Sequence, residues 1–227
     1  MTQRLRRLLI WLFRAFALAA MAAVLLVFAF RWLPPPTTYY VMAEHVRLGK
    51  VARRWTPAAR MSPHLPVAVI AAEDVKFCAH AGFDFEAIRA AFEDDSRLRG
   101  GSTISQQVAK NVFLWPDRSW LRKGLEAGFT VLIELLWPKA RIVEVYLNVA
   151  EFGEGVFGAE AAARHHFGRS AADLSAAEAA RLAAILPNPK SRSPVSLTPF
   201  LDRRVRSIRG SMETLEAEDR LDCLATG

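Results

Sequence analysis

The chain has 227 residues, of which 52% are hydrophobic, and its formal net charge is +7. This length supports one good hydrophobic core, and no internal repeat indicates a second domain. The positive charge does not by itself indicate a nucleic-acid-binding protein, because part of it comes from Arg4, Arg6, Arg7 and Arg14, which lie beside or within a long apolar segment.

The apolar segment follows the first arginines. Residues 15–30 carry no charge, and the stretch 8–33 approaches the ~20 residues needed to span a bilayer. The arginines before it place the N-terminus in the cytoplasm and the rest of the chain outside, where nucleic acid is not expected as a partner. Small residues at 19–23 leave a cleaved signal peptide as the alternative, but the apolar run continues past them, which favours a retained anchor.

We therefore divide the chain into a basic tail (1–7), an anchor (8–33), a linker and lead-in (34–60) and a main folded domain (61–227). Apolar spacing, capping boxes and the stops at Gly and Pro predict a mainly α-helical domain. The expected helices cover 67–72, 85–98, 103–113, 122–137, 142–149, 159–167, 175–186 and 199–215, with a glycine-punctuated loop at 151–159. The stripe on 122–137 indicates a core helix, and Glu144 falls on the exposed side of its helix.

Glu73 is the first candidate for chemistry. It follows the apolar run 67–72, so its carboxylate leaves a segment that tends to be buried, and burial raises a carboxyl pKa towards the range useful to a general base. The alternative is that Glu73 and Asp74 simply end a helix in solvent.

A polar face on the 103–113 helix is the second candidate. Gln106 and Gln107 precede Lys110 by four and three residues, and a donor-rich face near a helix N-terminus suits an anionic ligand. An ordinary solvated face is the alternative.

Glu126 lies four residues after Arg122 and three after Lys123, so it is either a functional carboxylate or part of an ion pair.

The two cysteines, Cys78 and Cys223, are far apart in the sequence and fit no metal-binding pattern. An oxidising compartment would permit one bridge, but nothing in the spacing requires it. We expect both thiols to be free.

Four ordered motifs then resemble a known family. They are Glu73-Asp74-x-x-Phe77-x-x-His80-x-Gly82, the segment 100–111 (GGSTISQQVAKN), Arg122-Lys123-x-x-Glu126 and Val145-Tyr146-Leu147-Asn148. Together they resemble the peptidoglycan glycosyltransferases of family 51 over residues 61–194, and segments 122–128 and 150–153 resemble the monofunctional members. The resemblance implies a lysozyme-like, mainly α domain preceded by one transmembrane helix.

The resemblance also implies a reaction. The family polymerises lipid II into glycan strands in the periplasm at the bacterial inner membrane, releasing undecaprenyl diphosphate. Glu73 matches the general base that deprotonates the acceptor sugar hydroxyl, and Glu126 matches a second carboxylate. The matching substrate-binding positions are Asp74, His80, Ser102, Thr103, Gln107, Lys110, Asn111, Arg118, Arg122 and Lys123.

The implied partners are lipid II, the growing glycan strand, the membrane and other cell-wall synthesis proteins. No cofactor is required by this interpretation, although a divalent cation, Mg²⁺ or Mn²⁺, could assist at the donor diphosphate. Two other functions stay open: a lysozyme-like glycan hydrolase, and a non-catalytic membrane-anchored scaffold that binds peptidoglycan. The Lys and Arg cluster disfavours the hydrolase, because cleaving a glycan polymer releases no diphosphate.

Overall fold

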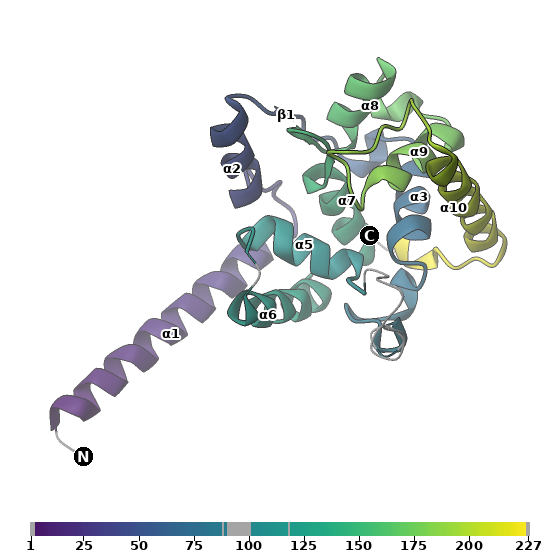
Figure 1. The fold of residues 1–227 in the computed structure, drawn as a ribbon. Helices are drawn as coiled ribbons and strands as arrows, with labels where there is room; N and C mark the ends of the chain where they lie inside the picture. The colour runs from purple at the N-terminus through teal and green to yellow at the C-terminus, as the bar shows by residue number, and fades with distance from the viewer. Residues whose placement is uncertain (1–2, 88, 90–100, 118, 226–227) are drawn as a thin grey trace.

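A computed structural model describes residues 3–87, 89, 101–117 and 119–225, and Figure 1 shows a mainly helical chain, as predicted. Most of the helix expected at 85–98 lies outside the described residues; 85–87 are helical. Helix α1 (Gln3–Phe30) projects away from the rest of the chain and is long and apolar enough to cross a membrane.

The end of α1 is built into the domain. Val27 is fully buried, and its carbonyl accepts a hydrogen bond from Trp137 Nε1 at 2.8 Å. The Phe30 carbonyl accepts from Arg141 Nη2, also at 2.8 Å. The apolar helix is therefore anchored to the folded domain through its last turns.

Residues 34–60 fold onto the domain. They contain α2 (Tyr39–Leu48), the short strand β1 (Ala52–Arg53) and a 3-10 turn, η1 (Ala58–Arg60). Strand β1 pairs in parallel with β3 (Val156–Phe157), which pairs antiparallel with β2 (Glu151–Gly153), giving the order β1-β3-β2.

The prediction of a loop at 151–159 is thus wrong, because these residues form the β2–β3 hairpin. One of these glycines does allow a close approach of two backbone segments. Gly158 has φ of +84°, and a Cβ there would lie 3.0 Å from the Asn148 carbonyl oxygen. Both features favour glycine.

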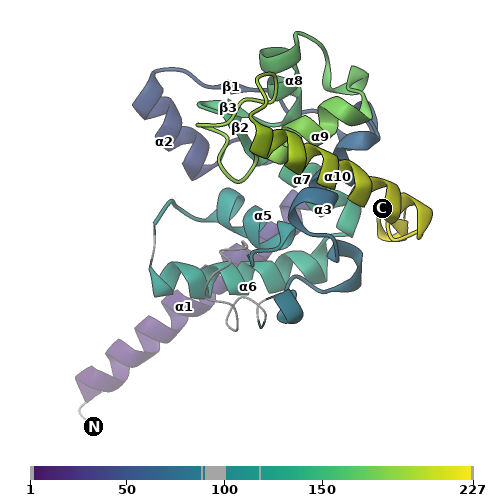
Figure 2. The same ribbon diagram turned by 45° about the vertical axis from the view of Figure 1, so that its right-hand side comes forward.

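The helices of the domain form two groups. Helix α3 (His64–Glu73) packs against α9 (Ala176–Ile185) and α10 (Pro199–Ala217), and Figure 2 shows α10 crossing both. In the second group, helix α5 (Ile104–Phe113) packs against both α6 (Trp120–Leu136) and α7 (Lys139–Val149). The remaining elements are α8 (Ala159–Phe167), η2 (Phe77–Ala79), η3 (Ala171–Asp173) and η4 (Asp222–Leu224).

Helix α3 is central to the core. Leu65, Ala68, Val69 and Ile70 are at most 1% exposed, and every residue from Val67 to Ala71 is buried. Capping boxes are present, as predicted, at the start of α5 (Thr103 and Gln106) and at the start of α9 (Ser175 and Glu178). The prediction that α6 is a core helix is only partly confirmed. Ile133 is buried, but Leu125 is 39% exposed, because α6 lies at the edge of the domain, where it packs against α5 and α1.

Candidate active site

Glu73 is the last residue of α3 and has a partner on each carboxylate oxygen. Gln107 Nε2 on α5 donates to its Oε2 at 3.1 Å, and Arg204 Nη2 on α10 lies 3.4 Å from its Oε1. Burial raises the pKa of Glu73, while the hydrogen bond from Gln107 and the charge of Arg204 oppose that rise. The predicted burial of this carboxylate is confirmed.

Gln107 is oriented from its other side. Tyr146 on α7 is fully buried, and its hydroxyl donates to Gln107 Oε1 at 3.4 Å. Burial raises the pKa of Tyr146, which keeps the hydroxyl protonated as a donor. The amide oxygen of Gln107 is therefore occupied, and its NH₂ group faces the carboxylate.

Asp74 and His80 form a separate, internal pair. His80 Nε2 lies 2.8 Å from Asp74 Oδ1, and the N–H of Gly82 donates to His80 Nδ1 at 3.1 Å. The proton of the neutral imidazole therefore sits on Nε2 and is donated to Asp74. Asp74 Oδ2 accepts from the N–H of Ile104 at 2.9 Å, which ties the end of α3 to the start of α5.

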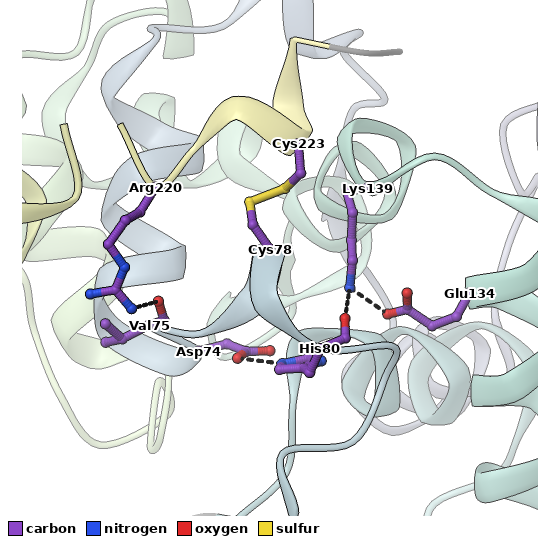
Figure 3. Close-up of a disulfide and its surroundings, with 8 residues drawn as sticks. All are labelled: Asp74, Val75, Cys78, His80, Glu134, Lys139, Arg220 and Cys223. Atoms are coloured by element: carbon purple, nitrogen blue, oxygen red, sulfur yellow. Dashed lines mark hydrogen bonds and ion pairs between the residues drawn. A yellow bond between two sulfur atoms is a disulfide. The ribbon is translucent and has the colours of Figure 1, made fainter. Parts of the chain in front are cut away.

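The cysteines correct a prediction: Cys78 and Cys223 are disulfide-bonded, not free. After α10 the chain returns as η4 beside η2 and brings the two Cα atoms to 5.6 Å, within the range that a disulfide spans. Figure 3 shows the bond next to the Asp74–His80 pair, with Lys139 Nζ donating to the His80 carbonyl. The bond therefore fixes the segment that follows Glu73.

A cleft of about 590 Å³ opens beside this region. Gln107, Lys110 and Asn111 of α5 and Arg122 of α6 line it, together with Tyr146. Its other lining residues are Tyr40, Leu114, Trp115, Pro116, Asp117, Ala150, Glu151, Leu186, Pro187 and Pro189. Glu73 does not line this cavity itself and reaches it through Gln107.

The cationic side of the cleft is organised by Glu126. This carboxylate is buried; Arg122 Nη1 lies 2.6 Å from its Oε2, and Lys123 Nζ contacts its Oε1. Lys110 is open to the cleft, but the protein around it removes part of its hydration, and this desolvation lowers its pKa. The positive charges of Arg122 and Lys123 lower the pKa further. The predicted holding of Glu126 by cations of its own helix is confirmed, whereas a catalytic role stays a prediction.

The predicted site residues thus fall into distinct groups. Gln107, Lys110, Asn111 and Arg122 share the cleft, and Lys123 and Glu126 adjoin it. Asp74 and His80 lie in the internal network, as does Thr103, whose hydroxyl donates to the Gly82 carbonyl. Ser102 is half-buried just before α5, and Arg118 lies outside the described residues.

Two further residues depart from the sequence-based interpretation. Glu144, expected on an exposed face, is half-buried: it accepts a hydrogen bond from the Ala58 N–H at 2.8 Å and pairs with Arg141. Arg204 was not singled out at all. Its helix was predicted at 199–215, but only the packing of α10 on α3 brings this arginine to Glu73.

The donor set offers little for a resident metal. Among the described residues, no group of three or more His, Cys, Asp or Glu side chains is placed to hold an ion. The carboxylates that line the cleft are Asp117 and Glu151, and Glu151 already contacts Tyr40 and Lys190.

The largely buried carboxylate of Glu73 thus lies beside a cleft lined by Lys110 and Arg122, in a helical domain preceded by a long apolar helix. Residues 41–213 match the family model described as Transglycosylase, and the chain belongs to that family. The resemblance inferred from the four motifs is confirmed.

Curated relatives match nearly the whole chain. It is 52% identical over 226 residues to the biosynthetic peptidoglycan transglycosylase of Jannaschia sp. strain CCS1, covering 99% of this chain and 92% of that protein. Identity to the protein of the same name from Rhodospirillum centenum is 52% over 210 residues, or 90% of each chain. The protein of the same name from Caulobacter vibrioides is 48% identical over 224 residues, which cover 97% of this chain and 96% of that protein.

Proposed function

We propose that this protein is a peptidoglycan glycosyltransferase that polymerises lipid II into glycan strands and releases undecaprenyl diphosphate. Family membership and the names of its relatives support the reaction class. The observation that carries the assignment of residues is the placement of Glu73 against Gln107, at the edge of a cleft lined by Lys110 and Arg122.

Glu73 acts as the general base. Its ionised carboxylate takes the proton of the acceptor sugar hydroxyl, whose oxygen attacks the anomeric carbon of the donor. The bond from that carbon to the diphosphate oxygen breaks, the electron pair leaves with the diphosphate, and the configuration inverts. The raised pKa of Glu73 makes it a stronger base than an exposed carboxylate, and such a base contributes about 10²- to 10⁴-fold.

The cations of the cleft receive the leaving group. Lys110 and Arg122 line the cleft and supply positive charge where negative charge accumulates on the diphosphate. Glu126 holds Arg122 and Lys123 in place, so its role here is to orient cations. A divalent cation, Mg²⁺ or Mn²⁺, would neutralise further diphosphate charge and would be carried by the substrate's oxygens more than by protein ligands.

We place the domain in the periplasm, with α1 retained as a single-pass anchor. The arginines before α1 support this orientation, and the disulfide suits an oxidising compartment. Helix α6, which contacts α1, exposes Trp120, Leu121 and Leu135 at 92%, 70% and 75%, an apolar face suited to the bilayer surface. Intact mass measurement of the membrane-extracted protein tests retention, since a cleaved signal would remove the first ~20 residues.

The test of function is product analysis with the full-length protein in detergent. With purified lipid II, the proposal predicts glycan polymer and released undecaprenyl diphosphate. Digestion of preformed glycan without polymer formation would establish the hydrolase instead, and binding of either substrate without turnover would establish the scaffold. The growing strand and other cell-wall synthesis proteins are the remaining proposed partners.

A further inference from the structure

Arg204 connects three elements around Glu73. Its Nε donates to the Ala184 carbonyl in the last turn of α9 at 3.2 Å. Its Nη2 lies 3.4 Å from the Ala72 carbonyl in the last turn of α3, and 3.4 Å from Glu73 Oε1. Carbonyls in the last turn of a helix lack partners within the helix, so one guanidinium serves two helix ends and one carboxylate.

We propose that Arg204 is a positioning residue for the reaction: its guanidinium holds the Glu73 carboxylate at the end of α3 and keeps it ready to accept a proton. This inference rests on the proposed function, in which Glu73 is the base. Arg204 does not line the cleft, so it acts through Glu73 and not on the substrate.

The geometry divides the work between the two oxygens of Glu73. Oε2 accepts from Gln107, which faces the cleft, and Oε1 faces Arg204 on α10. The carboxylate is therefore fixed in rotation as well as in position. A lysine at 204 would supply charge but not the planar fork that reaches both helix ends and the carboxylate.

The charges that act on Glu73 come from several elements. Asp74 on the same segment raises the pKa of Glu73, and Arg192, in the loop before α10, lowers it together with Arg204. From α5 and α7, Lys110 and Tyr146 are electrostatically coupled to Glu73. Of the two arginines, Arg204 is the one in direct contact and has the larger effect.

The sign of the effect follows. Removing the positive charge raises the pKa of Glu73, so the ionised base is lost at a higher pH. The acidic limb of the activity profile then moves to higher pH, and the loss of activity grows as the pH falls.

The test compares full-length Arg204→Gln, Arg204→Lys and Arg206→Gln with wild type, measuring kcat and KM for lipid II polymerisation across pH. Arg206 is the matched control, because it is exposed and pairs with Asp202 of its own helix. Arg204→Gln should lose about tenfold in kcat/KM at acidic pH and less at alkaline pH. Arg204→Lys should keep the wild-type acidic limb but lose kcat severalfold with KM unchanged, and Arg206→Gln should match wild type.

Two results would overturn the inference: an Arg204→Gln loss that is the same at every pH, or an Arg204→Lys enzyme with wild-type kcat. If thermal melting shows that Arg204→Gln does not fold, the kcat and KM of Arg204→Lys decide alone. Failure of the proposed function would look different, because Glu73→Gln would then retain polymerisation or wild type would make no polymer, whatever stands at 204.

Discussion

Replacing the disulfide is expected to destabilise the domain strongly. The bond closes a loop between residues 145 positions apart. The chain-entropy relation for such a loop gives about 5 kcal/mol at 25 °C, and removal of native disulfides typically costs about 2–5 kcal/mol. At about 2–4 °C per kcal/mol for a chain of this size, Cys78→Ser with Cys223→Ser should lower the melting temperature by roughly 4–20 °C.

The assay is thermal unfolding in detergent, with and without a thiol reductant. Wild type should melt lower when reduced, and the double variant should melt at that lower temperature in both conditions. Activity should fall as well, because Cys78 lies in the short segment between Asp74 and His80 that ties α3 to α5.

The arginine variant Arg220→Gln is the matched control. Arg220, in the same C-terminal segment, donates to the Val75 carbonyl at 3.3 Å and lies 3.4 Å from Glu218 Oε2, so its loss removes exposed contacts without opening the loop. It should shift the melting temperature far less than the double serine variant. Equal melting of oxidised and reduced wild type, with two titratable thiols in the oxidised sample, would refute the reasoning.

Three further predictions concern single positions. Gly158→Ala should destabilise by about 1–3 kcal/mol in thermal unfolding, given its positive φ and the close Asn148 carbonyl, whereas Gly210→Ala on α10, with open space around it, should be neutral or slightly stabilising. Lys110→Ala should lower kcat/KM by about 10²- to 10³-fold through loss of charge at the leaving group, and a retained rate would remove Lys110 from the mechanism. Glu126→Gln should lower kcat/KM without moving the acidic limb, since Glu126 orients cations; a moved limb would instead make it a titrating catalytic group.

The features that the sequence predicted correctly depend on local patterns. The capping box at Thr103 and Gln106 defined the start of α5, and the apolar run before Glu73 predicted both a helix and the burial of its final carboxylate. These features depend on residues within a few positions of each other, so spacing alone reveals them.

The features that sequence reasoning missed depend on distant segments. Cys78 meets Cys223, and Arg204 meets Glu73, only because α10 crosses α3 and the chain then turns back as η4. The hairpin at Glu151–Gly153 and Val156–Phe157 is short and rich in glycine, and its pairing with β1 comes from a hundred residues away in the chain. No periodicity within these segments predicts such contacts.

The most direct test of the central claim is glycan-strand formation by full-length Glu73→Gln beside wild type, with the fold of both verified by thermal melting. Glutamine keeps the size of the side chain and removes the base. We expect the folded variant to lose about 10²-fold or more in kcat/KM. A folded Glu73→Gln enzyme that keeps most of its polymerising activity would contradict the assignment of Glu73 as the general base.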